Sequence, residues 1–134
     1  MKVEFMTAFN TLKKHLSSEV VEMGDIISYW ADPFTVPKNR TIMLPDSHSV
    51  SNGRLTFTVI LWVSIMEKNH ETVSQSQMVV MEKIFKAVCG DIPPPIISAS
   101  VNTADYFDPT PQGPNIGVLR IIAEITVDFL DDCI

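Results

Sequence analysis

Two long stretches of the chain alternate hydrophobic and polar residues with the period of two that predicts a half-buried β-strand. In residues 54–67, one set of alternate positions is hydrophobic throughout: Leu55, Phe57, Val59, Leu61, Val63 and Ile65. Residues 117–130 have a similar hydrophobic set, and their opposite set is mostly polar: Arg120, Glu124, Thr126 and Asp128. We therefore expect each strand to bury one face.

Two other segments carry the period of an α-helix. In residues 3–18 the hydrophobic side chains recur at spacings of three and four: Phe5, Phe9, Leu12 and Leu16. Residues 71–89 predict a second helix, with a capping box at Thr72 and Gln75 and a stop at Gly90. Its buried stripe is expected to contain Met78, Met81, Ile84, Phe85 and Val88.

Shorter patterns complete the chain. We expect short strands at 25–30 and 40–44, the second ended by Pro45, and a further strand around 97–101. Asn52-Gly53 indicates a tight turn. Residues 104–116 hold three prolines and a glycine, and they predict a long loop that becomes ordered on contact with a neighbour.

The order of elements predicts an α+β fold. We expect a mostly antiparallel sheet of about four strands with two helices packed on one face. At 134 residues the chain is predicted to form a single domain, 1–134. With 46% hydrophobic and 19% charged residues it has the composition of a globular protein.

Candidate chemistry is sparse in this sequence. The three histidines lie in different predicted elements, and Cys89 and Cys133 form no CxxC pair. The sequence has no common catalytic motif, so we expect neither an enzyme nor a bound cofactor or metal. Asn102, Asp105 and Asp108 could surround a hard cation, although aspartates in such a loop usually form local turns.

Charge is distributed unevenly along the chain. The net charge is −6, and residues 91–134 hold seven acids against one base, Arg120. No basic stripe is present to hold phosphates, so sequence-specific nucleic-acid binding is not expected. The longest strongly hydrophobic run, residues 59–66, is too short for a membrane-spanning helix, and we expect no membrane association.

Several hydrophobic side chains suggest a contact surface. Ile60 and Trp62 fall on the strand face opposite the core set. Two interpretations are open: a third helix or residues 19–53 cover these side chains, or another subunit covers them. Tyr106 and Phe107 lie in the predicted loop, and aromatic residues are enriched at interface hot spots. We expect these four residues to form a subunit interface. The aromatic residues Tyr29, Trp30 and Phe34 form either a binding patch or part of the core.

The chain has an N-terminal helix, the short strand NRTIMLP, the long strand RLTFTVILWVSIME, a second helix and the segment IISASVNTADYFDPTPQGPNIGVLRIIAEITVDF. This order of elements resembles the small tail-completion proteins of long-tailed bacteriophages, especially the tail terminator family. That resemblance implies a homo-oligomeric ring, usually a hexamer, at the end of the tail tube. Its partners would be the tail tube protein and the head–tail connector protein, in the host cytoplasm during assembly and then in the virion tail.

A ring at that place would enclose a channel for DNA. An acidic wall would let DNA slide, because like charges raise the energy of contact. The acids expected at the channel are Asp105, Asp108, Glu124 and Asp128. Ordinary solubilising charge is the alternative interpretation of these residues.

A different class of function also fits the sequence. A small α+β ligand-binding domain, or an enzyme of unknown substrate, would have a pocket between the helices and the sheet. A strict monomer would favour that alternative.

Overall fold

The computed structural model describes residues 5–36, 38–51, 53–107 and 115–128, apart from the side chains of residues 51 and 128. The elements run in this order: α1 (Phe5–Glu19), the short 3-10 helix η1 (Val21–Met23), β1 (Asp25–Ile27), β2 (Arg40–Ser51), β3 (Arg54–Met66), α2 (His70–Cys89), β4 (Ile96–Phe107) and β5 (Ile116–Asp128).

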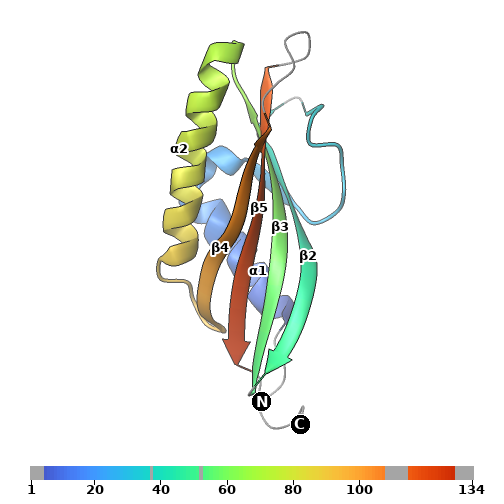
Figure 1. Ribbon diagram of the computed structural model, residues 1–134, viewed down its shortest axis with the longest axis vertical. Helices are drawn as coiled ribbons and strands as arrows, with labels where there is room; N and C mark the ends of the chain where they lie inside the picture. The colour runs from blue at the N-terminus through green and yellow to red at the C-terminus, as the bar shows by residue number, and fades with distance from the viewer. Residues whose placement is uncertain (1–4, 37, 52, 108–114, 129–134) are drawn as a thin grey trace.

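The described strands form one sheet in the order β1-β2-β3-β5-β4. The pairs β2–β3, β3–β5 and β4–β5 are antiparallel, whereas β1–β2 is parallel. The buried residues of α1 and α2 pack in a single cluster with the core-facing residues of β3 and β5. Both helices therefore cover the same face of the sheet, and the expected α+β fold is confirmed (Figure 1).

Helix α2 begins one residue earlier than the sequence predicts, and its N-cap is different. The side chain of Asn69 accepts a hydrogen bond from the amide of Thr72 at 3.1 Å. This bond satisfies an amide that has no partner within the helix. The predicted capping box at Thr72 and Gln75 is therefore wrong, because Thr72 already lies inside the first turn.

The buried stripe of α2 is also rotated from its predicted place. Met81, Ile84 and Val88 are buried as expected, but Met78 and Phe85 are exposed. Four other residues of the helix are buried beside the first three: Val73, Gln77, Val80 and Ala87. The polar Gln77 belongs to this stripe because its amide has partners in the sheet.

Strand β2 is much longer than predicted and continues through Pro45. It pairs with β3 over its whole length, with a register shift between Pro45 and Ser47. Its other side pairs with β1 only from Arg40 to Ile42. Pro45 thus lies beyond the end of β1, where a residue without an N–H donor is tolerated.

Strands β4 and β5 shorten the predicted loop 104–116. Residues 104–107 belong to β4 and pair with residues 118–121, and β5 begins at Ile116. Residues 108–114 lie outside the described residues. Tyr106 and Phe107 are therefore strand residues, and the interpretation of both as loop residues is wrong.

Gln77 is a fully buried polar side chain that ties α2 to the sheet. Its Nε2 donates to the carbonyl oxygens of Phe107 at 3.1 Å and Val118 at 3.3 Å. Gly117 leaves the space for this amide: a Cβ atom there would lie 2.6 Å from Gln77 Cδ and 2.5 Å from Val73 Cγ1. A glycine is required at this point because the helix and the strand approach closely.

Replacing Gly117 with alanine should therefore destabilise the protein by about 1–3 kcal/mol, as expected for an overpacked core. Urea unfolding of G117A against the wild type measures this loss. The matched control is S100A in β4, an exposed site where the change should stay within about 0.5 kcal/mol. An unchanged midpoint for G117A would show that α2 moves away from β5 at no cost.

Candidate interaction surface

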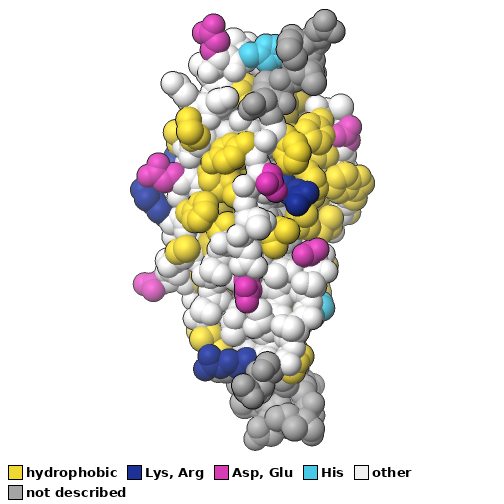
Figure 2. Space-filling view, in the orientation of Figure 1, with side chains coloured by type: hydrophobic (Ala, Val, Ile, Leu, Met, Phe, Trp, Pro, Cys, Tyr) yellow, Lys and Arg dark blue, Asp and Glu magenta, His cyan; other side chains and the backbone are white. Residues whose placement is uncertain are grey.

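The sheet face opposite the helices is divided into a polar half and a hydrophobic half. The polar half carries the hydroxyl side chains of Ser47, Ser49, Thr56, Thr58, Ser98, Ser100 and Thr126. The hydrophobic half carries Ile42, Leu44, Ile60, Trp62, Phe107, Val118 and Ile122. Figure 2 shows this face, with hydrophobic side chains gathered over the upper half of the molecule.

Residues 28–36, which we call the strap, follow β1 and lead towards β2. They cover part of the hydrophobic half of the sheet face. Ser64, on the outer face of β3, donates its hydroxyl to the carbonyl oxygen of Pro33 at 2.6 Å. Val36 is buried with Ile116 and Val118, and Trp62 packs against this cluster. The strap therefore seals the upper end of the sheet face.

Four aromatic rings form two layers where the strap meets the sheet. Trp30 meets Trp62 edge to face, with ring centroids 5.7 Å apart, and Phe34 meets Phe107 in the same way at 6.1 Å. Trp62 and Phe107 are themselves neighbours at 6.2 Å. These separations are typical of favourable aromatic pairs. The strap rings form the outer layer, since Trp30 is 59% and Phe34 43% exposed.

One ion pair lies within this hydrophobic surface. Arg120 Nε is 3.5 Å from Asp105 Oδ2, and the guanidinium carbon lies 5.8 Å from the centre of the Trp62 ring. Both charged side chains are partly exposed, so the ion pair adds at most about 1 kcal/mol to stability. Its structural effect is to hold the guanidinium near the indole, a cation–π arrangement.

The residues predicted for a subunit interface are not all on one face. Ile60, Trp62 and Phe107 lie on the outer face, as their register with Ile122, Arg120 and Val118 requires. Tyr106 pairs with the core-facing Leu119, so it lies on the helix side of the sheet. Trp62 is only partly exposed because residues of the 19–53 segment cover it, as one of the two sequence interpretations allowed.

The acids predicted for a channel are also separated. Asp105 and Glu124 both lie on the outer face, opposite Arg120 and Thr58 respectively. They are about 13 Å apart along the sheet, given the rise of a strand. Asp108 and the side chain of Asp128 lie outside the described residues. Of the two described acids, Asp105 is paired with a cation and Glu124 lies in the polar half.

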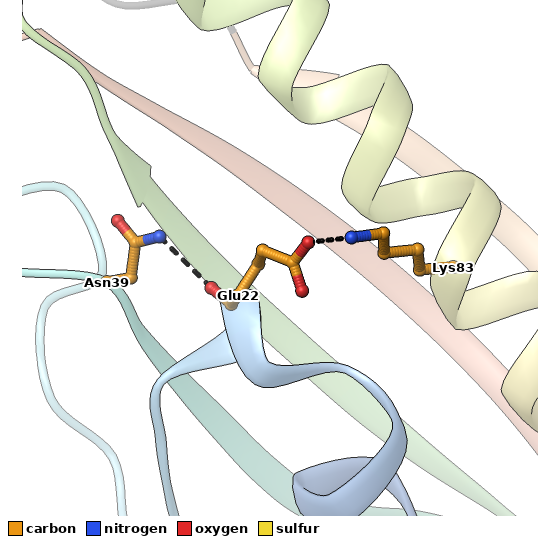
Figure 3. A network of polar contacts seen from close by, with 3 residues as sticks. All are labelled: Glu22, Asn39 and Lys83. Atoms are coloured by element: carbon orange, nitrogen blue, oxygen red, sulfur yellow. Dashed lines mark hydrogen bonds and ion pairs between the residues drawn. The ribbon is translucent and has the colours of Figure 1, made fainter.

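Asn39, between the strap and β2, contacts η1 and β3 in a polar network that Glu22 extends to α2 (Figure 3). Asn39 Nδ2 donates to the carbonyl oxygen of Glu22 at 3.0 Å, and Asn39 Oδ1 accepts from the amide of Met66 at 2.8 Å. Lys83 of α2 donates to the Glu22 carboxylate. That hydrogen bond holds the pKa of Glu22 below its usual value of 4.5.

The described residues also contain open hollows away from this surface. One, of about 500 Å³, lies between α1 and α2 and is lined by side chains of both charges: His15, Glu19, Glu22, Lys83, Lys86 and Asp91. The ring of His15 is engaged there with the carbonyl oxygen of Ala87 at 2.9 Å. No group of three or more potential metal-binding side chains occurs within the described part of the chain.

Sequence reasoning identified Trp62 and Phe107 but not the role of the strap. The aromatic residues at 29, 30 and 34 were interpreted as either a binding patch or part of the core, with core packing as the commoner fate, whereas all three are exposed. The pairing of Asp105 with Arg120 was not predicted, because Asp105 was assigned to a loop. A predicted strand that continued past residue 103 would have placed Asp105 opposite a residue of the last strand and so indicated this ion pair.

Comparison with known proteins adds no family to this description. No protein-family model matches the sequence, and no curated protein matches it significantly. None of the described helices is long and hydrophobic enough to cross a membrane.

Substitution of Trp30 and of Trp62 should have different effects on stability, because the two side chains lie in different layers of the aromatic cluster. W30E should change the free energy of unfolding by less than about 1 kcal/mol, because the side chain is mostly exposed. W62E should cost about 2–3 kcal/mol, because it removes the indole that packs against Trp30 and Phe107 and places a charge beneath the strap. Urea unfolding measures both. Equal losses would contradict the two-layer arrangement.

The Glu22–Lys83 pair should make a small, pH-dependent contribution to stability. A lowered pKa stabilises the fold above the unfolded pKa, and this stability is lost as the pH falls through the folded pKa. E22Q should therefore lose about 0.2–1 kcal/mol at pH 7, since the pair is partly exposed and screened by solvent. Below the lowered pKa the two proteins should unfold alike.

K83M provides the matched control for this pair. In that background E22Q should cause no further loss at pH 7, because the partner of the carboxylate is already absent. A loss that persists unchanged in acid would assign the effect of E22Q to something other than the charge of Glu22.

Proposed function

We propose that this chain is a structural protein of a phage or prophage tail, a tail terminator or tail-completion subunit that forms a ring at the end of the tail tube. The observation that carries the proposal is the exposed aromatic surface of Trp30 and Phe34, which is built on the outer face of a rigid sheet. The resemblance of the sequence to the tail-completion proteins supports it independently.

The chemistry of this surface favours a protein partner. Contiguous exposed hydrophobic patches on soluble domains mark interaction sites. Tryptophan and arginine are the residue types that most often dominate binding energy, and here Trp30, Trp62 and Arg120 lie together. Such a surface suits a partner that stays bound once assembly is complete.

The proposed partners are other copies of the chain, the tail tube protein and the head–tail connector protein. Copies would form the ring, a hexamer in the assembled tail. Glu124, among the hydroxyl side chains of the polar half, suits a wall along which DNA slides without adhering. Assembly would take place in the host cytoplasm, and the finished ring would belong to the virion tail.

Deleting the gene from the phage or prophage that carries it tests this proposal. We expect filled heads without attached tails, together with tail tubes of irregular length, in electron micrographs of the lysate. Wild-type protein supplied from a plasmid should restore joined particles. V21E should restore them equally well, because Val21 is 77% exposed but lies in η1, away from the aromatic surface.

W30E should fail to restore joined particles although it folds. Normal infectious virions in the absence of the gene would refute the role in the tail. A protein that is strictly monomeric and binds a small molecule at a defined site would instead favour the ligand-binding or enzyme alternative.

A further inference from the structure

The molecule has a second exposed hydrophobic surface on the outer flank of α2. Met78 is 57% and Phe85 41% exposed, and Glu82 lies between them on the same side of the helix. Lys83 faces η1, and the helical period places Met78 and Phe85 about 150° round the helix from it. We call Met78, Glu82 and Phe85 the helix flank.

The strap and the helix flank lie on opposite sides of the molecule. In Figure 1 the strap stands at the right margin and α2 at the left, both in the upper half of the view. Figure 2 shows hydrophobic side chains at both margins. One copy therefore cannot cover its own strap with its own helix flank, whereas a neighbouring copy can.

The open strand edges are poorly suited to joining copies. Strand β4, at one edge, has register shifts between Ile96 and Ser98 and between Val101 and Thr103. On the other edge, the part of β2 beyond β1 contains Pro45 and a further register shift. Bulges and prolines are the devices that keep sheet edges from pairing with another chain. Neighbouring copies are therefore more easily joined through the strap and the helix flank than through their strand edges.

We infer that the strap of one copy, led by Trp30, packs on the helix flank of the next copy. This inference rests on the proposed ring, because a head-to-tail contact between two different surfaces is the kind that closes into rings. The inference goes beyond the proposed ring by naming the two surfaces through which neighbouring copies meet.

The charges beside the two surfaces can form complementary pairs, because Arg40 and the exposed Asp32 lie at the strap, and Glu82 and Lys86 lie at the helix flank. Arg40, next to the strap, donates through Nη2 to the backbone oxygen of Asp32 at 3.3 Å, and no ion pair of Arg40 occurs among the described residues. The helix flank presents Glu82, whose ion pair with Lys86 is highly exposed and easily exchanged. A carboxylate from one copy can therefore approach an arginine of the next.

The interface area that this contact requires is a small part of the molecular surface. A standard interface buries roughly 800 Å² on each partner. The described surface totals 7462 Å², so each contact would use about one-tenth of it. Both contacts of a ring subunit together would occupy about one-fifth.

Mixing two blocked variants tests the inference. W30E blocks the strap and F85E blocks the helix flank, so each variant alone should be monomeric at concentrations where the wild type is oligomeric. An equimolar mixture should form dimers and nothing larger, because one intact strap and one intact helix flank remain. Size-exclusion chromatography with light scattering measures the masses. Each substitution should weaken its contact by at least about 100-fold, as for a hot-spot residue.

V21E serves as the matched control and should assemble like the wild type. Circular dichroism reports whether each variant is folded, and M78E replaces F85E on the same flank if F85E does not fold. F85E and M78E that both assemble like the wild type would overturn the inference. So would a mixture of W30E and F85E that stays monomeric.

The wild type also gives a decisive result. A wild type that remains monomeric at every concentration overturns this contact between copies. If deletion of the gene still left heads and tails unjoined, the proposed function would stand, with the ring assembled through other surfaces. If deletion had no effect but the mixture formed dimers, the contact would stand and the tail function would fall.

Discussion

The antiparallel pairing of β3 with β5 is the constraint on which the rest of the structure depends. The two strands pair from Arg54–Asp128 to Met66–Ile116 without a register shift. Their alternate side chains fill the core on one side, and this leaves the other set on the outer face. Half of that outer set is hydrophobic, so the sheet needs cover on both faces. The strap supplies part of this cover, and the exposed Trp30 and Phe34 then become the outermost hydrophobic layer.

The sequence predicts most faithfully the elements whose pattern is local. The period of two in β3 and β5 and the period of three to four in α1 follow directly from alternation and helix geometry. Pro45 and the prolines after residue 108 misled the prediction of β2 and β4, because a neighbouring strand decides whether a proline is tolerated. The stripe of α2 was misplaced because the buried Gln77 has partners 30 and 41 residues away, which no local pattern reveals.

The candidate surface depends on contacts that are still more distant along the chain. Trp62 and Ile60 were found by asking which side chains break the polar pattern of an outer face. Trp30 and Phe34 were assigned only when the strap was seen to cross that face and to be held by Ser64. A segment without regular structure has no period, so its place on the sheet cannot be derived from the spacing of its residues.

The division of the outer face also bears on how the sheet finds its correct alignment during folding. A slip of one residue between β3 and β5 would exchange the side chains of the two faces. In the upper half both faces are largely hydrophobic, so a slip there is opposed mainly by Arg120, which a displaced β5 would turn towards the core. In the lower half it would bury either Thr56 and Thr58, if β3 is displaced, or Glu124, if β5 is displaced, and it would expose their hydrophobic neighbours. The hydroxyl-rich half thus opposes a slip of either strand, and its polarity helps to keep the fold unique.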